Sequence, residues 1–161
     1  LVASGRRREY VGRSDRVFSS PRWVRFAEME YSVPRAAAPA VIKSVRAVID
    51  AQGLRVSFPV EVRFSAGDDI ALSPAYGGPR CFVAVHMYRG LDYGRYFREV
   101  EAITSDVGGR PHWGKLHSQT AATLAPRYPE WERFRAVRRR LDPEGRFANA
   151  YLDRVLGPVD R

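Results

Sequence analysis

Hydrophobic and polar residues alternate in three stretches of the chain, a pattern typical of β-strands. The first stretch, residues 23–33, changes register near Ala27, which predicts a slip or a bulge there. The second, residues 54–64, contains Pro59, and a proline favours an edge position or an irregular hydrogen bond. The third, residues 81–88, alternates without interruption. These stretches predict the strands of a sheet.

The third stretch has two distinct faces, because successive side chains of a strand point in opposite directions. The face predicted to belong to the core carries Cys81, Val83, Val85 and Met87. The other face carries Phe82, Ala84, His86 and Tyr88. Glu61 and Arg63 also share a face, since they are two residues apart on the second stretch. The surface with His86 and Tyr88 is therefore a candidate for the surface with Glu61 and Arg63.

Apolar residues recur at helical spacing in three further stretches. Residues 37–52 form the first, and Gly53 is a natural C-terminal stop. The second has its apolar stripe over residues 93–103, and the third covers residues 129–141. The order of strands and helices predicts an α+β fold, with an antiparallel or mixed sheet covered by helices on one side.

The composition allows one packed domain, because 45% of the 161 residues are hydrophobic. The formal net charge of +9 raises the question of a nucleic-acid partner. However, the arginine runs at 6–8 and 138–140 are far apart, and no zinc-finger or RNA-binding motif accompanies them. We therefore expect no nucleic-acid partner and interpret the charge as a solvated basic surface.

The numbers and positions of cysteines and histidines restrict the kinds of site that this chain can carry. Cys81 is the only cysteine, so no disulfide can form within the chain, and a reducing cytoplasm fits best. The three histidines show no ligand spacing, which predicts no metal site. No apolar run approaches the roughly 20 residues that span a bilayer. Neither a Gly-x-Ser-x-Gly elbow nor a phosphate-binding glycine loop is present.

The strongest site candidate is the stretch 109–117, which presents His112, Trp113 and Lys115 within four residues of a loop. A short helix is predicted after it, at 119–124. Taken alone, Lys115 has an ordinary interpretation as a solvated surface lysine.

The second candidate is the pair formed by Glu61 and Arg63, a carboxylate and a guanidinium side by side. On its own this pair is an ordinary ion pair on an exposed sheet. If the loop folds against this strand, the two candidates together can hold a polar substrate.

Four motifs follow one another along the chain: Glu61-x-Arg63, Leu72-Ser73-Pro74, His112-Trp113-Gly114-Lys115, and Leu141-Asp142-Pro143 with Phe147-Ala148-Asn149-x-Tyr151-Leu152. Together they resemble the C-terminal part of the aldonolactone oxidoreductases, flavoproteins of the vanillyl-alcohol-oxidase type. That group includes gulonolactone and arabinonolactone oxidases or dehydrogenases and the related alditol oxidases. The resemblance runs from around Phe18 to Gly157.

The resemblance implies that residues 21–141 are the substrate domain, or cap, of an FAD enzyme. Residues 1–20 would be an irregular remnant of an upstream region, and residues 142–161 a tail that returns toward the flavin domain. FAD would be bound mainly by an N-terminal domain that is not in these residues. The other implied partners are a small sugar lactone and oxygen or another electron acceptor. The implied location is cytoplasmic, and membrane association through the missing part stays open.

The resemblance also assigns catalytic roles to Glu61, Arg63 and Lys115. The first two contact the hydroxyls at the carbon being oxidised, and Lys115 points at the substrate oxygen beside the flavin. A carboxylate can accept and orient the hydroxyl hydrogen bond, while the two cations stabilise developing negative charge.

Further contacts are implied by position. His86 matches a residue that binds the far end of the polyol in alditol oxidases. Tyr88 stands where those enzymes have a smaller residue, which favours a cyclic lactone. His112 either touches the substrate or fixes the loop. Asn149 and Tyr151 either contact the cofactor or pack between domains, and the resemblance places Lys115 against the cofactor as well as the substrate.

We therefore expect an FAD-dependent oxidoreductase that oxidises a CH–OH of an aldono-1,4-lactone of the gulono or arabinono type, yielding an ascorbate-type product. Two alternatives remain. One is an alditol oxidase, and the other is a noncatalytic basic interaction module descended from such a cap.

Overall fold

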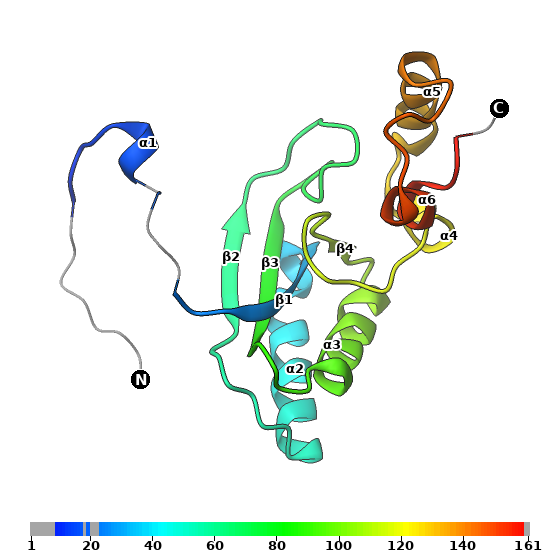
Figure 1. The fold of residues 1–161 in the computed structure, drawn as a ribbon. Coiled ribbons are helices and arrows are strands. Elements are labelled where there is room, and N and C mark those ends of the chain that lie inside the picture. Colours follow the sequence, from blue (N-terminus) through cyan, green and yellow to red (C-terminus); the bar gives the residue numbers. More distant parts are fainter. Residues whose placement is uncertain (1–8, 18, 20–22, 160–161) are drawn as a thin grey trace.

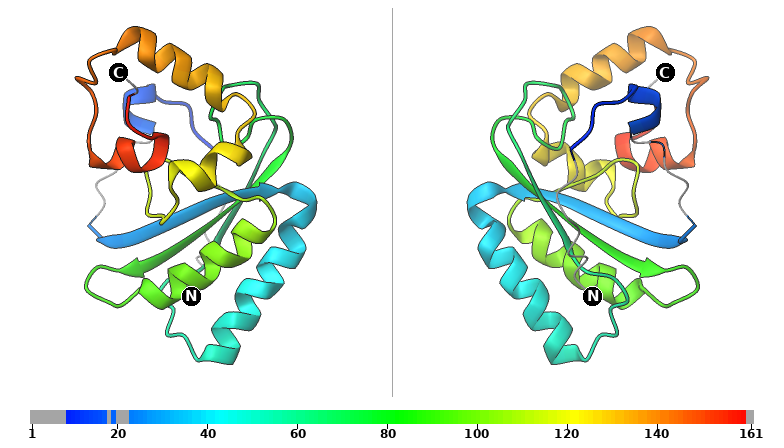
Figure 2. Two further views of the ribbon diagram at one scale, coloured as in Figure 1. Left: turned by 90° about the vertical axis from the view of Figure 1, so that its right-hand side faces the viewer. Right: turned by 90° about the vertical axis from the view of Figure 1, so that its left-hand side faces the viewer.

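The computed structural model describes residues 9–17, 19 and 23–159, which form a sheet with helices on both sides (Figures 1 and 2). The four strands lie in the order β2-β3-β1-β4, and every neighbouring pair is antiparallel. Their bounds are β1 Phe26–Pro34, β2 Glu61–Ser65, β3 Arg80–Tyr88 and β4 Arg110–Pro111. The predicted α+β class and antiparallel sheet are confirmed, but helices lie on both sides of the sheet rather than on one.

The helices divide into two groups (Figure 2). The long helices α2 and α3 lie against one face of the sheet, whereas α4, α5 and α6 lie on the opposite side. The α-helices are α1 Ser14–Val17, α2 Ala38–Gln52, α3 Gly94–Asp106, α4 Ala121–Leu124, α5 Trp131–Leu141 and α6 Ala150–Leu156. Short 3-10 helices are η1 Arg35–Ala37 and η2 Ala125–Arg127.

The main core lies between the sheet and the helices α2 and α3. Alternate residues of β1 and β3 meet the apolar stripes of both helices, and α2 ends at Gly53, whose φ of 58° suits glycine. The buried members are Met29, Tyr31, Val33, Ala38, Val41, Val45, Cys81, Val83, Val85, Met87, Tyr96, Phe97 and Val100. The predicted core face of residues 81–88 is thus confirmed.

A second, smaller core joins the helices on the opposite side of the sheet. Its buried members are Leu72, Leu124, Tyr128, Trp131, Val155 and Leu156. Leu72 has a φ of 60°, the left-handed region that side chains other than glycine rarely adopt. Its backbone oxygen accepts a hydrogen bond from Trp113 Nε1 at 2.8 Å. The tail therefore packs against the segment that follows the candidate loop.

Two predictions about the strands are wrong. β1 pairs with β3 in continuous register from Phe26 to Pro34, without a bulge at Ala27. Val24 lies before the strand, and Phe26 belongs to it but points to the face opposite Met29, where it packs against His86. The second strand begins at Glu61 rather than at residue 54. Pro59 cannot donate to a ladder, and the preceding residues pack irregularly against the main core.

The ends of the chain also differ from expectation. The short helix α1 lies within the segment predicted as irregular, while residues 1–8, 18 and 20, with the arginine run at 6–8, lie outside the described residues. The tail that begins at residue 142 contains the helix α6. In the described part of the chain, no helix is long and apolar enough to cross a membrane.

Candidate functional site

The candidate site is built on the face of the sheet that points away from α2 and α3. Alternation along β1 directs Glu28 and Glu30 to this face. Glu28 is opposite His86, and Glu30 is opposite Ala84. Ala84 is in turn opposite Glu61 on β2. A small alanine thus lies between two carboxylates, and this leaves room for a long side chain to cross the middle strand.

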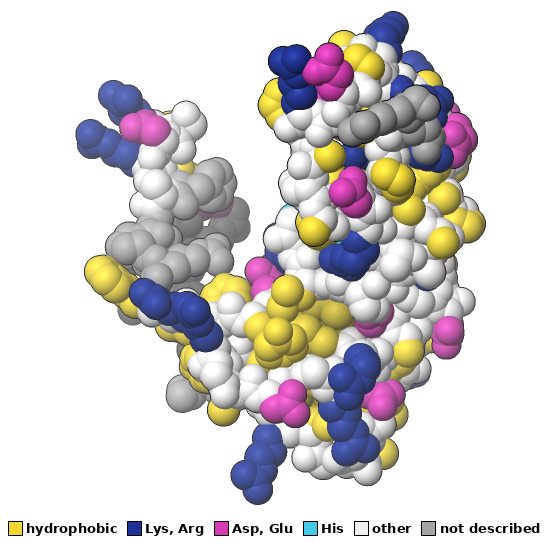
Figure 3. All heavy atoms as spheres, turned by 45° about the vertical axis from the view of Figure 1, so that its right-hand side comes forward, with side chains coloured by type: hydrophobic (Ala, Val, Ile, Leu, Met, Phe, Trp, Pro, Cys, Tyr) yellow, Lys and Arg dark blue, Asp and Glu magenta, His cyan; other side chains and the backbone are white. Residues whose placement is uncertain are grey.

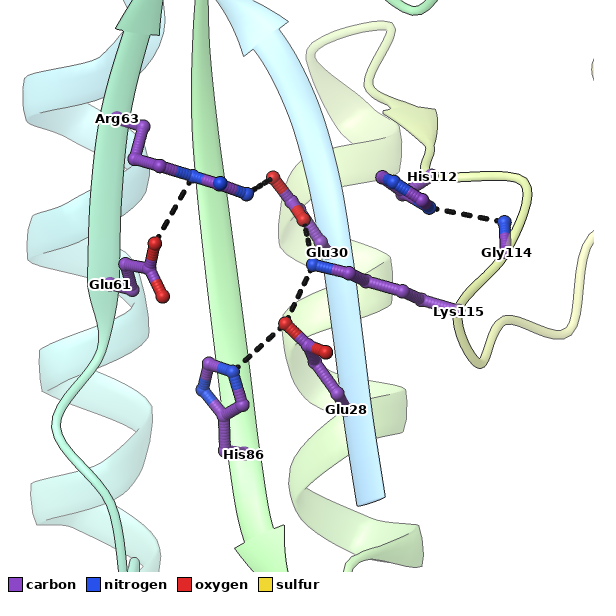
Figure 4. A network of polar contacts seen from close by, with 8 residues as sticks. All are labelled: Glu28, Glu30, Glu61, Arg63, His86, His112, Gly114 and Lys115. Atoms are coloured by element: carbon purple, nitrogen blue, oxygen red, sulfur yellow. Dashed lines mark hydrogen bonds and ion pairs between the residues drawn. The ribbon is translucent and has the colours of Figure 1, made fainter. Parts of the chain in front are cut away.

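Arg63 makes that crossing from the edge strand β2 (Figure 4). Its Nη2 lies 2.5 Å from Oε1 of Glu30, and its Nε lies 3.1 Å from Oε1 of Glu61. The predicted pairing of Glu61 with Arg63 is present. The guanidinium also binds a carboxylate from a strand that is not its direct neighbour.

The loop is held to the free edge of β1 by backbone hydrogen bonds. The amide of His112 donates to the oxygen of Glu30, and the amide of Leu116 donates to the oxygen of Glu28, each at 2.9 Å. Between them the chain makes a tight turn, in which the amide of Gly114 donates to Nδ1 of His112 at 3.0 Å. This turn presents Lys115 to the polar face of β1.

The turn from α3 into the loop requires glycine at position 109. The amide of Gly109 donates to the oxygen of Thr104 at 2.8 Å, and a Cβ at this position would lie 2.4 Å from that oxygen. The close approach places β4 beside β1 immediately afterwards. The glycine thereby fixes where the loop begins.

Lys115 lies between two carboxylates (Figure 4). Its Nζ is 2.6 Å from Oε1 of Glu28 and also donates to Oε2 of Glu30. Nε2 of His86 lies 2.9 Å from the same Glu28 oxygen. The side chain of Glu30 is fully buried, whereas that of Glu28 is 23% exposed. Glu28 can therefore be reached from solvent, and Glu30 cannot.

Opposite charges in this cluster shift the pKa values of Glu28 and Arg63. Burial alone would raise the pKa of Glu28, but Lys115 and His86 together lower it below its ordinary value. Burial would lower the pKa of Arg63, whereas Glu30 and Glu61 raise it. Three carboxylates thus face the two basic side chains of Arg63 and Lys115.

Aromatic side chains close one end of the polar face. The ring of His86 packs edge-on against Phe26, with centroids 5.1 Å apart. The ring of Tyr88 lies 4.4 Å from that of Phe58, which also approaches His86. Tyr88 remains 45% exposed. This end of the site therefore offers flat apolar surfaces beside polar groups.

An open hollow of about 700 Å³ lies beside the cluster. It is lined by Phe26, Ala27, Glu28, the loop from Trp113 to His117, Tyr151 and Arg154. The hydroxyl of Tyr151 donates to the oxygen of Trp113 at 2.5 Å and lies 3.1 Å from Nε2 of His117. The tail therefore supplies one wall of this hollow.

The structure brings together four of the predicted residues. Arg63, His86 and Lys115 contact Glu28 or Glu30, and Glu61 joins them through its ion pair with Arg63. The remaining four are more peripheral. Tyr88 lies at the aromatic end, the ring of His112 is bonded within its own turn, and Tyr151 lines the hollow. The side chain of Asn149 caps α6 by accepting from the amide of Leu152 at 2.9 Å.

Sequence reasoning missed Glu28 and Glu30. A signal was available, because two glutamates alternate with Met29, Tyr31 and Val33 on one strand and so must share the opposite face. His117 was given no role, and it proves to link the loop to Tyr151. Among the residues that the structure describes, no cluster of three or more His, Cys, Asp or Glu could hold a metal ion.

The charged surface is mixed. On the face shown in Figure 3, lysine and arginine side chains are interspersed with acidic and hydrophobic ones rather than gathered in one continuous patch. Within the described residues, a group of linked ion pairs lies instead on the polar face of the sheet, around Glu28 and Glu30.

The polar face of the sheet thus joins the Lys115 ammonium and the Arg63 guanidinium through Glu30, and Lys115 also lines the open hollow. Residues 2–155 match the model of the family described as D-arabinono-1,4-lactone oxidase. The chain belongs to this family.

Named relatives agree with that membership. The chain is 53% identical over 146 residues to L-gulono-1,4-lactone dehydrogenase of Mycobacterium tuberculosis, covering 91% of this chain and 34% of the relative. It is 41% identical over 132 residues to L-gulonolactone oxidase of Bos taurus, covering 79% and 30%. It is 36% identical over 132 residues to an alditol oxidase of a Streptomyces species, covering 80% and 31%. The chain spans about a third of the length of these relatives.

Proposed function

We propose that this chain is the substrate-binding cap of an FAD-dependent oxidoreductase that oxidises a CH–OH of an aldono-1,4-lactone. The observation that carries the proposal is the convergence of Arg63 and Lys115, from two distant segments, on one buried carboxylate, with Lys115 also lining an open hollow. Such an arrangement holds two cations ready for a substrate oxygen that gains negative charge. The names of the relatives point to the same substrate class.

The residues that line the hollow fit the substrate-facing side of a flavin. Trp113, Tyr151 and Phe26 offer aromatic walls for a planar ring, while Lys115 and Arg154 offer positive charge. FAD, held mainly by a domain outside this chain, would accept the hydride released from the substrate carbon. Tyr151 would face the ring system, and Asn149 would set its position by capping α6.

Glu61, Arg63 and Lys115 divide the work at the reacting alcohol. Glu61 is about half exposed, so one of its oxygens can accept the hydrogen bond of the hydroxyl and orient its proton. Arg63 and Lys115 donate to the oxygen as it becomes electron-rich. His86, Tyr88 and His112 would contact hydroxyls or ring atoms farther from that carbon.

The aromatic end of the site favours a cyclic lactone over an extended alditol. Tyr88 packs on Phe58 and Phe58 approaches His86, so these rings shorten the polar face where a long polyol would lie. A five-membered lactone ring presents a flat surface that can stack on such side chains.

The test uses the full-length protein that contains this chain, loaded with FAD, and measures the reduction of a dye that depends on gulono- or arabinono-1,4-lactone. Replacing Lys115 with methionine removes the charge and keeps most of the side-chain length. We expect kcat to fall about 10²-fold to 10³-fold.

The chain offers a matched control, because its only other lysine is Lys43, exposed on α2. Lys43→Met should retain full activity. Equal activity of Lys115→Met and Lys43→Met would contradict the role of Lys115. A flavin-loaded wild type that reduces no dye with either lactone would favour the noncatalytic interaction module.

A further inference from the structure

We propose that Glu30 is the positioning residue that fixes Arg63 and Lys115 relative to each other; this inference rests on the function proposed above. Each carboxylate oxygen of Glu30 binds a different cation, Oε1 to Arg63 at 2.5 Å and Oε2 to Lys115. No other residue in the described part of the chain binds both cations. Figure 4 shows Glu30 between the two side chains.

Burial ties the carboxylate of Glu30 to both of its cationic partners. A buried carboxylate costs free energy unless it is paired, and both partners of Glu30 come from distant segments, 33 and 85 residues away. The ion pairs therefore form only when β2, β1 and the loop are in their native positions. The side chain of Glu30 cannot rotate toward solvent without leaving both cations.

The backbone of Glu30 adds a second constraint on the same loop. Its oxygen accepts the amide of His112 at 2.9 Å, three residues before Lys115. One residue thus holds the beginning of the turn through its main chain and the end of the Lys115 side chain through its carboxylate. The ammonium is located from both directions.

Glu28 does not duplicate this function. It binds Lys115 and His86 but not Arg63, and it lines the hollow, where a substrate can reach it. Glu30 is sealed beneath its two cations and does not line the hollow. It can therefore influence the reaction only through the positions and charges of its neighbours.

Two substitutions of Glu30 test the inference in the FAD-loaded full-length enzyme. In Glu30→Gln, the amide oxygen can accept from one cation, and the amide nitrogen repels the other. In Glu30→Asp, the charge stays but the carboxylate is drawn back by about 1.5 Å. We expect each to lower kcat about 10²-fold, with a smaller rise in KM, because displacement by about 1 Å has costs of that size.

The matched control is Glu101→Gln. Glu101 is also a buried carboxylate, 8% exposed, and accepts hydrogen bonds from Tyr31, Ser118 and Gln119 rather than from the site cations. Glu101→Gln should lower thermal stability about as much as Glu30→Gln does. It should leave kcat of the folded enzyme within about twofold of the wild type. A Glu30→Gln kcat equal to that of Glu101→Gln would overturn the inference.

A double variant separates positioning from general damage. If Glu30 acts by placing Lys115, then Glu30→Gln should reduce kcat much less when Lys115→Met is already present. Full additivity of the two losses would count against the bridge.

A readout without activity uses lysine acetylation followed by peptide mass spectrometry. In the wild type Lys115 should react more slowly than the exposed Lys43, because its side chain is only 17% exposed and its ammonium is covered by two carboxylates. Glu30→Gln should increase the rate at Lys115 and leave Lys43 unchanged. An unchanged rate at Lys115 would overturn the bridge.

The two proposals fail in different ways. A wild type without lactone-dependent reduction would reject the proposed function, and the acetylation rates would then decide alone whether Glu30 holds Lys115. An active wild type, combined with insensitive Glu30 variants, would reject the bridge and retain the function.

Discussion

The two faces of β1 are buried for opposite reasons. Met29, Tyr31 and Val33 are covered by apolar side chains of α2 and α3, and their burial stabilises the fold. On the other face Glu30 is buried as deeply, but it is covered by cations. Charged groups rarely add net stability when buried, so the second face is better explained by what it does than by what it stabilises.

The largest difference between the faces should appear in Met29→Ala. Removing this side chain leaves a cavity in the main core, and we expect the free energy of unfolding to fall by about 4 kcal/mol. Lactone oxidation per folded molecule should hardly change. Denaturant titration and dye reduction on the same samples measure both effects, and Met29→Leu, which conserves volume, should lose less than about 1.5 kcal/mol.

Glu30→Met should cost somewhat less, about 3 kcal/mol, because it leaves Lys115 and Arg63 without their shared partner. Arg63 is half exposed and recovers part of its hydration, which limits the loss. Adding Lys115→Met to this variant should restore stability without restoring activity. If the double variant were less stable than Glu30→Met, the polar face would be a stabilising element after all.

The loop beside the polar face of β1 should make the free energy of unfolding depend on pH, whereas the apolar core contains few groups that titrate. Burial and the nearby Arg154 lower the pKa of His117 from 6.5 to about 4. Between these values the unfolded chain binds a proton that the folded chain does not. The stability linked to His117 is therefore fully present above pH 6.5 and is lost as the pH falls toward 4.

We expect that loss to be about 2 kcal/mol, less than the full shift implies because the side chain is only partly buried. His117→Gln keeps a hydrogen-bond donor near Tyr151 but cannot titrate in this range. Its unfolding free energy should vary less between pH 6.5 and 4 than that of the wild type. Parallel curves for the two proteins would reject the assignment.

The smallest effect is expected at the tail. Asn149→Ala removes the cap of α6 and should cost about 1 kcal/mol. If its main role is to place α6, Asn149→Asp, which caps equally well, should retain both stability and FAD affinity. A loss of FAD affinity in Asn149→Asp without a loss of stability would instead indicate a direct contact with the cofactor.

Local pattern was enough to predict the two faces of β3 and the extents of α2 and α3, because period-2 and helical spacing express burial directly. It failed over residues 54–60, where apolar residues reach the core without forming a strand. These residues are hydrophobic because they pack against the main core, and their alternation does not correspond to strand pairing.

The site was predicted in part for a similar reason. Arg63, His86 and Lys115 were singled out by motif and by strand face, whereas Glu28 and Glu30 were overlooked. Their burial depends on a loop that joins β1 through the backbone amides of His112 and Leu116. Backbone pairing leaves no side-chain pattern, so the sequence did not show that this face of β1 is covered.

Leu72 illustrates how the two sides of the molecule constrain future change. Its left-handed backbone aims the carbonyl at Trp113, while its side chain fills the second core. Glycine would relieve about 1 to 2 kcal/mol of backbone strain, but the lost side chain would cost about 2 to 5 kcal/mol. Alanine would keep the strain and lose the packing. Neither substitution is neutral, so we expect Leu72 to stay unchanged while residues of the neighbouring loop vary.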